Sequence, residues 1–91
     1  MTINFGVIGV GVMGQNHARI AYTLPGIILV GVADADVARG GEIAQKYRTK
    51  AFADYREMLP EVDAVCVATP TQTHYQIARD VLSAGKHLLI E

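Results

Sequence analysis

The chain has 91 residues, of which 51% are hydrophobic and 19% are charged, and its formal net charge is −1. This composition is typical of one small globular domain and excludes an intrinsically disordered chain. The near-neutral charge argues against nucleic acid or an anionic membrane as a partner.

The sequence shows no pattern typical of a membrane span, a signal peptide or a disulfide framework. No apolar run approaches the ~20 residues that span a bilayer. The first residues lack the basic region of a signal peptide. The single cysteine, Cys66, allows no internal disulfide and lies between valines, which indicates an inert core position. We therefore expect a cytoplasmic protein without a membrane partner.

The chain begins with an apolar run, residues 3–8, that shows no alternation and predicts a strand buried on both faces. Gly9, Gly11 and Gly14 follow with the spacing G-x-G-x-x-G, and a helical pattern then continues to residue 24. A strand, this glycine spacing and a helix are the context of a dinucleotide-binding fingerprint, in which the free amides of the helix start hold phosphates.

Each position of this turn has a physical task. Gly9 allows the tight turn out of the strand, Gly11 lets a pyrophosphate approach the backbone, and Gly14 lets the helix lie close to the strand. Val12 and Met13 lie between these glycines and are therefore also candidate cofactor contacts.

Strands and helices alternate along the rest of the chain. Further strands are expected at 27–33, 50–52, 63–68 and 87–90, and helices at 36–47, between Asp54 and Pro60, and from Thr73 to a left-handed Gly85. The alternation predicts right-handed parallel crossovers and a doubly wound α/β sheet, with the strand order 3-2-1-4-5.

The helix boundaries follow from capping residues. Asp36 is expected to cap the second helix, while Asp54 with Glu57 and Thr73 with Gln76 resemble capping boxes. The faces expected to be buried are Met13, His17, Ile20, Ala21 and Leu24 in the first helix, Ile43, Ala44 and Tyr47 in the second, and Ile77, Ala78, Val81 and Leu82 in the last.

Because parallel strands end at one edge of a sheet, Gly9, Asp34, Thr69-Pro70 and Glu91 are expected along one rim. Asp34 lies twenty residues after Gly14, at the tip of the second strand. An acid there accepts hydrogen bonds from the adenine-ribose hydroxyls and repels a 2′-phosphate, which favours NAD over NADP.

Other readings of these residues stay open. Asp34 could instead cap a helix, although Asp36 is available for that role, and Arg39 could pair with the 2′-phosphate of NADP. His17 fits the edge of the core better than a ligand contact. His74, at a helix start near the rim, suits cofactor contact and helix packing equally. The histidines have no partners at metal-ligand spacing, and no catalytic nucleophile set can be assembled.

Several motifs occur in order over nearly the whole chain. They are Gly9-x-Gly11-x-Met13-Gly14 with His17-Ala18, Val32-Ala33-Asp34, Asp54-Tyr55-x-Glu57-Met58-Leu59, Val62-Asp63-Ala64-Val65, Ala68-Thr69-Pro70-x-x-x-His74, and Gly85-Lys86-His87-Leu88-Leu89-Ile90-Glu91. In this combination the chain resembles the N-terminal NAD(P)-binding domain of the glucose–fructose oxidoreductase and inositol dehydrogenase family, called Gfo/Idh/MocA.

The resemblance implies an NAD(P)-dependent oxidoreductase that moves a hydride to or from a sugar, cyclitol or related polyol. It implies a pyrophosphate on Gly9 to Gly14, the adenine ribose on Asp34, and the middle of the cofactor against Ala68, Thr69-Pro70 and His74. Thr71 departs from the asparagine that is frequent after the proline in this family.

The resemblance also sets an expectation about domain content. Glu91 matches the first residue of the Glu-Lys-Pro motif of the family, whose lysine is the catalytic candidate. We therefore expect residues 1–91 to be an incomplete dinucleotide-binding domain, truncated after the fifth strand and without a substrate domain, which binds cofactor without catalysis. A homo-oligomer is expected because the strand His87–Ile90 would leave an apolar sheet edge. The alternatives are a nucleotide-sensing module and an S-adenosylmethionine-binding, methyltransferase-like domain.

Overall fold

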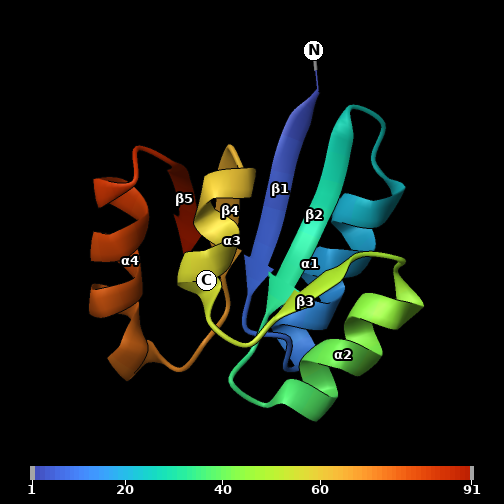
Figure 1. Cartoon of the computed structure of the whole chain (residues 1–91), viewed down its shortest axis with the longest axis horizontal. Helices are drawn as coiled ribbons and strands as arrows, with labels where there is room; N and C mark the ends of the chain where they lie inside the picture. Colours follow the sequence, from blue (N-terminus) through green and yellow to red (C-terminus); the bar gives the residue numbers. More distant parts are fainter. Residues whose placement is uncertain (1, 91) are drawn as a thin grey trace.

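A five-stranded parallel sheet forms the centre of the molecule, and the computed structural model describes residues 2–90 (Figure 1). The strands are β1 (Ile3–Ile8), β2 (Ile27–Ala33), β3 (Lys50–Phe52), β4 (Ala64–Val67) and β5 (His87–Ile90). All pairings are parallel and the order is β3-β2-β1-β4-β5. The predicted doubly wound sheet and strand order are confirmed, and β4 is one residue shorter at each end than expected.

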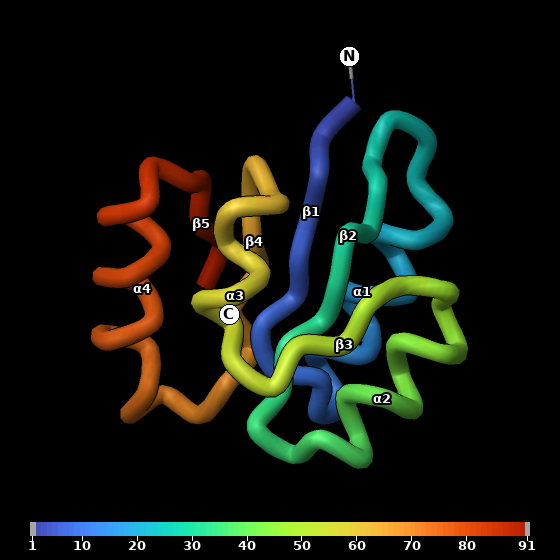
Figure 2. The backbone as a smooth tube through the Cα atoms, viewed as in Figure 1, coloured from blue at the N-terminus to red at the C-terminus, as the bar shows by residue number. Residues whose placement is uncertain are grey.

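The helices lie in two layers on opposite faces of this sheet. The first layer contains α1 (Val12–Thr23) and α2 (Val37–Lys46). The second contains α3 (Tyr55–Met58) and α4 (His74–Ser83), with short 3-10 turns at Leu59–Glu61 and Thr71–Thr73. The tube in Figure 2 shows that the chain after β3 crosses over and adds β4 on the side of β1 away from β2.

Each central strand supplies both apolar layers. In β1, Val7 packs with the α1 and α2 layer, whereas the next residue, Ile8, packs with the α3 and α4 layer. In β2, Val32 and Ala33 divide in the same way. Successive side chains of a strand point to opposite faces of the sheet. A strand that is covered by helices on both faces therefore carries apolar residues at successive positions. This explains the continuous apolar runs in the sequence.

The buried face of α1 differs from the predicted one. Met13, Ile20 and Leu24 are 49%, 42% and 49% exposed, whereas Ala21 is buried as predicted. Two small residues that were not predicted, Gly14 and Ala18, are buried beside it. Because small side chains recur at helical spacing on this face, α1 can lie close to the sheet. The larger side chains of α1 then lie at the edge of the contact between helix and sheet. The prediction was wrong because it ranked positions by hydrophobicity and not by the space available.

The start of α4 also differs from the prediction. Thr73 has helical backbone angles (φ −95°, ψ −9°) and makes no capping bond, and Gln76 donates to Asp80 instead (3.1 Å). The predicted Thr73–Gln76 capping box is therefore wrong, and Leu82 is 61% exposed and not buried. The left-handed Gly85 is confirmed by its φ of +73°.

The other two caps are present. Asp36 accepts a hydrogen bond from the backbone N–H of Arg39 (3.1 Å), and Asp54 accepts one from the N–H of Arg56 (2.9 Å). These bonds satisfy amides that lack partners within the first turn of a helix. They fix where α2 and α3 begin, next to the carboxyl ends of β2 and β3.

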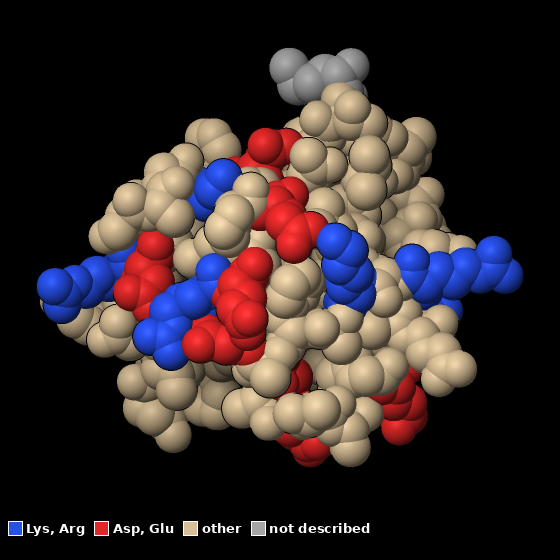
Figure 3. All heavy atoms as spheres, viewed as in Figure 1, with Lys and Arg blue, Asp and Glu red and all other residues tan. Residues whose placement is uncertain are grey.

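Charged side chains of both signs are mixed on the face that carries α3 and α4 (Figure 3). Arg56 lies 3.0 Å from Asp54 and Lys50 lies 2.7 Å from Glu61, so opposite charges meet on this surface. The expectation that nucleic acid is not a partner stays a prediction. Within residues 2–90, no helix combines the length and the apolar character needed to cross a membrane.

Met58 tests the layer beneath α3 and α4. Its side chain is fully buried in the same cluster as Val65 and Val81. Met58→Ala should lower the free energy of unfolding by about 2–5 kcal/mol, because it removes buried methylenes and leaves a cavity. Urea denaturation measures this change. Leu82→Ala, at an exposed position, is the control and should stay within about 0.5 kcal/mol; equal losses in both variants would contradict the described core.

Candidate functional site

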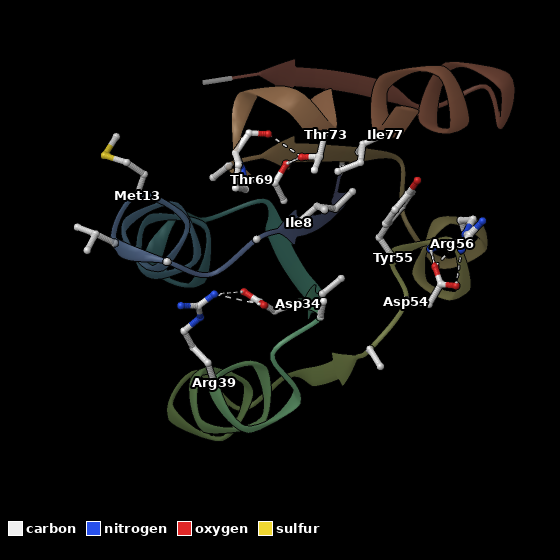
Figure 4. A pocket seen from close by; sticks show the side chains of 18 residues that line it. Ile8, Met13, Asp34, Arg39, Asp54, Tyr55, Arg56, Thr69, Thr73 and Ile77 are labelled. Atoms are coloured by element: carbon white, nitrogen blue, oxygen red, sulfur yellow. Dashed lines mark hydrogen bonds and ion pairs between the residues drawn. The ribbon is translucent and has the colours of Figure 1, made fainter. Parts of the chain in front are cut away.

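A cavity of about 810 Å³ opens at the carboxyl edge of the sheet, between the ends of β1, β2 and β4 (Figure 4). Eight predicted site residues line it: Gly9, Gly11, Val12, Met13, Asp34, Ala68, Thr69 and Pro70. Gly14 packs beneath the turn, and His74 lies outside the lining residues. Glu91 lies outside the described residues. The structure thus brings most of the predicted rim together at one cavity.

The glycine turn has the backbone geometry that its spacing predicts. Gly9 has a φ of +90°, a left-handed conformation that side chains disfavour, and its N–H donates to the carbonyl of Ala33 (2.7 Å). A Cβ on Gly14 would stand 1.7 Å from the carbonyl oxygen of Gly9, so a larger residue would force α1 away from β1.

The start of α1 is open toward the cavity. Gly11 is the N-cap residue and supplies no side-chain cap, and a Cβ at this position would meet nothing within 4 Å. Gly11, Val12 and Met13 all line the cavity. The first amides of a helix lack intrahelical partners and carry the positive end of the helix dipole, which makes this end suitable for an anion.

Asp34 joins the tip of β2 to the glycine turn. Its side chain is 7% exposed. One carboxylate oxygen accepts from the N–H of Val10 (2.9 Å), and the other accepts from the N–H of Asp36 (2.8 Å). Arg39 Nη2 lies 3.2 Å from the first of these oxygens. Charge-assisted bonds of this kind are short and directional, so the carboxylate holds the turn in place as well as facing the cavity.

The wall opposite the glycine turn follows β4. The N–H of Ala68 donates to the carbonyl of Ile8 (2.8 Å), which continues the pairing of β4 with β1 up to the rim. Thr69 and Pro70 come next and line the cavity. His74 Nε2 lies 2.8 Å from the carbonyl oxygen of Thr69. Its contact in the structure is therefore with this wall.

The sequence reasoning missed the inner end of the cavity. The residues concerned are Ile8, Ala33, Ala35, Ala53, Asp54, Tyr55, Arg56, Thr73 and Ile77. Most of the aliphatic ones come from the strand ends or from the inward side of α4. Arg39, which the sequence suggested as a partner of a 2′-phosphate, also lines the cavity. A signal for Ala53 and Asp54 was available, because the loop after β3 must end at the same edge as the loops after β1, β2 and β4.

A polar bridge joins α3 to α4 beside this inner end. The hydroxyl of Tyr55 donates to the carboxylate of Asp80, which also accepts from Gln76. Burial and the Asp80 carboxylate raise the pKa of Tyr55 from 10.0 to about 12. The bonds from Tyr55 and Gln76 hold the pKa of Asp80 below its ordinary value. At the neighbouring cap, the bonds from Arg56 lower the pKa of Asp54.

Potential metal ligands do not cluster in the described part of the chain. Within residues 2–90, no three His, Cys, Asp or Glu side chains lie close enough together to hold a metal ion. Cys66 is fully buried in β4. His17 is half-buried on α1; it does not line this cavity but lines a smaller groove with Phe5 and Leu89.

A doubly wound sheet, a glycine turn at a helix start and an acid at the tip of β2 together define a dinucleotide-binding domain of the Rossmann class. The family model described as "Oxidoreductase family, NAD-binding Rossmann fold" matches residues 3–91. The chain belongs to this family, Gfo/Idh/MocA, which confirms the resemblance that the sequence motifs indicated.

Relatives of the chain with curated names are dehydrogenases. It is 43% identical over 86 residues to UDP-N-acetylglucosamine 3-dehydrogenase of Acidithiobacillus ferrooxidans, covering 94% of this chain and 27% of the relative. It is 38% identical over 96 residues to inositol 2-dehydrogenase 1 of Saccharopolyspora erythraea, covering 100% of this chain and 28% of the relative. The chain thus spans less than a third of the length of these relatives.

Solved structures have the same fold. GenD2 from gentamicin A biosynthesis, in complex with NAD, has a TM-score of 0.94 at 33% identity, with 98% of this chain and 26% of that one covered. Scyllo-inositol dehydrogenase of Lactobacillus casei, with bound NAD(H) and scyllo-inositol, has a TM-score of 0.91 at 26% identity, with 99% and 28% covered. NAD is therefore the cofactor of the family to which this fold belongs, as predicted.

The Tyr55–Asp80 bond should make stability depend on pH at both extremes. The pKa of Asp80 is lowered on folding, so its contribution is complete above the ordinary 3.8 and is lost as pH falls through the lowered value. The pKa of Tyr55 is raised, so its contribution is complete below pH 10.0 and is lost as pH rises through about 12.

Urea unfolding of wild type and Tyr55→Phe over a pH series measures this dependence. The difference in unfolding free energy between the two should be flat at neutral pH and shrink toward both extremes. Tyr75→Phe, at a tyrosine that is 77% exposed, is the control and should follow wild type. A difference that stays constant at every pH would rule out the Tyr55–Asp80 bond as its source.

Proposed function

We propose that this chain is the NAD-binding part of an oxidoreductase that transfers a hydride between the nicotinamide and a sugar, cyclitol or related polyol. The observation that carries the proposal is the placement of Asp34 and the open start of α1 on one cavity at the carboxyl edge of the sheet. The names of the dehydrogenase relatives support the substrate class. For the chain itself, that class remains a proposal.

The cavity suits the parts of a dinucleotide in order. Within the turn from Gly9 to Gly14 we assign the pyrophosphate to the amides at the start of α1, because the N–H groups of Gly9 and Val10 are already bonded to Ala33 and Asp34. We assign the adenine ribose to Asp34. The apolar inner end, between Ala53 and Ile77, suits the adenine ring, because ligand pockets bind flat rings between apolar side chains. Ala68, Thr69 and Pro70 would then lie beside the nicotinamide half.

The division of work follows from this assignment. The nicotinamide, when bound, accepts or supplies the hydride. The described residues bind and orient the cofactor through backbone amides, one carboxylate and apolar walls. Hydride transfer further requires a positioned substrate and a group that takes or gives a proton. We assign those tasks to the whole protein and only cofactor binding to residues 2–90. A role for Glu91 stays a prediction.

Asp34→Asn tests the choice of cofactor. It should weaken NAD binding by about tenfold or more, because the carboxylate makes charge-assisted bonds to the ribose hydroxyls. It should also strengthen NADP binding relative to NAD, since the 2′-phosphate no longer faces a negative charge and Arg39 is released to pair with it. Isothermal titration calorimetry with both dinucleotides measures these changes.

Asp63→Asn provides a matched control. The Asp63 carboxylate also accepts from a backbone N–H, that of Asn4 (2.8 Å), but at the start of β4 and thus at the opposite edge of the sheet. This variant should bind NAD like wild type. An unchanged preference in Asp34→Asn would remove Asp34 from the ribose site. Saturable binding of S-adenosylmethionine with neither dinucleotide would overturn the proposed function in favour of the methyltransferase-like alternative.

We further propose that two copies of the chain associate along β5. This strand is at the edge of the described sheet, with Leu89 and Ile90 55% and 42% exposed, and an unpaired edge pairs readily with an identical one. A groove of about 190 Å³ beside it is almost wholly apolar, being lined by Phe5, His17, Ile20, Ala21, Leu24, Ile27 and Leu89. An exposed apolar surface of this kind is typical of an interface.

Leu89→Lys should shift the chain toward monomer, because association would then bring two unpaired charges together at the edge. Sedimentation velocity over a range of concentrations measures the shift. Leu82→Lys introduces the same charge on α4 and should leave the association unchanged. A wild-type monomer at every concentration would contradict the proposal.

A further inference from the structure

Thr69 is held by side chains from the beginning of α4. The Thr73 hydroxyl lies 2.7 Å from the Thr69 hydroxyl and 2.7 Å from the carbonyl oxygen of Pro70 (Figure 4). His74 Nε2 lies 2.8 Å from the carbonyl oxygen of Thr69. Thr69 and Pro70, in the segment after β4, are thus bonded by Thr73 and His74, the residue before α4 and its first residue.

The chemistry of these groups determines where the protons lie. A carbonyl oxygen can only accept, so the single hydroxyl proton of Thr73 points to Pro70, and the Thr69 hydroxyl donates to Thr73. For the same reason His74 carries a proton on Nε2, which in the neutral ring makes it the Nε2–H tautomer. Each of these bonds therefore has a defined direction. The hydroxyl of Thr73 and the Nε2–H of His74 both donate to backbone carbonyls of this wall.

Thr69 in turn touches the glycine turn. A Cβ at Gly9 would stand 2.8 Å from Cγ2 of Thr69 and 3.0 Å from the carbonyl oxygen of Ala68. The methyl group of Thr69 therefore lies directly against the turn, in the space that the missing side chain of Gly9 leaves. Any displacement of Thr69 changes the distance between the two walls of the cavity.

We propose that Thr73 and His74 are positioning residues, which hold the Thr69–Pro70 wall against the glycine turn before the dinucleotide binds. His74 is not among the residues that line the cavity, and the Thr73 hydroxyl is used within the wall, so both act through Thr69. A wall that is already ordered loses little freedom on binding, which increases affinity. This inference rests on the proposed binding of NAD at the same cavity.

The sequence had left His74 open between a cofactor contact and helix packing. A direct contact would place His74 among the residues that line the cavity, and it is not one of them; its Nε2 bonds to the Thr69 carbonyl. The residue that accepts this bond, Thr69, itself lines the cavity, so the bond links His74 to the site. Positioning through Thr69 accounts for both observations.

Paired substitutions test the role. Thr73→Val keeps the shape and removes the hydroxyl, and His74→Phe keeps a ring and removes the donor. Each should raise the NAD dissociation constant by about fivefold, the usual effect of one lost hydrogen bond. Thr73→Ser and His74→Gln restore a donor and should return the constant toward wild type. Thr23→Val removes a hydroxyl that bonds the carbonyl of Ile20 at the far end of α1, and it should leave NAD binding unchanged.

Amide hydrogen exchange tests the same role without any ligand. The N–H groups of Ala68 and Thr73 are bonded to Ile8 and Pro70 (2.8 and 2.9 Å) and should exchange slowly in wild type. In Thr73→Val and His74→Phe, their exchange should be faster by about fivefold, because local opening becomes easier. Residue-resolved exchange by NMR measures this in the free chain.

The outcomes separate the two proposals. Unchanged exchange at Ala68 and Thr73, or a failure of Ser and Gln to restore what Val and Phe lose, overturns the positioning role. A fall in thermal stability with an unchanged NAD dissociation constant also overturns it. If wild type binds no NAD, the proposed function fails, and the exchange measurement still decides whether Thr73 and His74 hold the wall.

Discussion

The hydrogen bond from the N–H of Val10 to the carboxylate of Asp34 is the interaction on which the site depends. It connects two strand ends that are 24 residues apart in sequence, and the neighbouring bond from Gly9 N–H to the Ala33 carbonyl runs beside it. A carboxylate that is 7% exposed needs several donors to offset its desolvation, and the backbone of the turn supplies one of them. The turn that we propose to bind phosphate and the carboxylate that we propose to bind ribose are consequently one unit.

The second wall of the cavity is built by a different principle. Thr69 and Pro70 extend β4 beyond the sheet, and short polar side chains from α4 hold them in place. Between the two walls, the ends of β1 and β2 supply an apolar floor through Ile8 and Ala33. Polar groups therefore surround the rim where phosphates and hydroxyls would lie, while the interior offers apolar surface to a ring. This gradient of polarity would orient the dinucleotide that we propose to bind there.

The features that could be predicted from the sequence are those that depend on residues close together in the chain. The continuous apolar strands, the glycine spacing and the Asp36 cap each depend on neighbours within one element, and they determined the strand order and the position of Asp34. The errors concern contacts between elements. The choice of Ala18 over Ile20 for the buried face of α1 depends on the distance between helix and sheet. The Thr73 hydroxyl could bond either to the free amides of the helix start or to the residues before it, and only the folded chain shows that it bonds to Thr69 and Pro70.

The ion pair between Arg39 and Asp34 connects cofactor choice to the shape of the turn. Arg39 is about half exposed and lies 3.2 Å from the carboxylate, so it balances that charge when no ribose is bound. A ribose with two hydroxyls can donate to Asp34 and leave this balance intact. A 2′-phosphate would place a second anion beside the same carboxylate, and Arg39 would have to leave Asp34 to meet it. Replacing Asp34 to admit the phosphate would also remove the acceptor that holds Val10. The proposed preference for NAD and the geometry of the glycine turn therefore rest on the same side chain, and a change in one would alter the other.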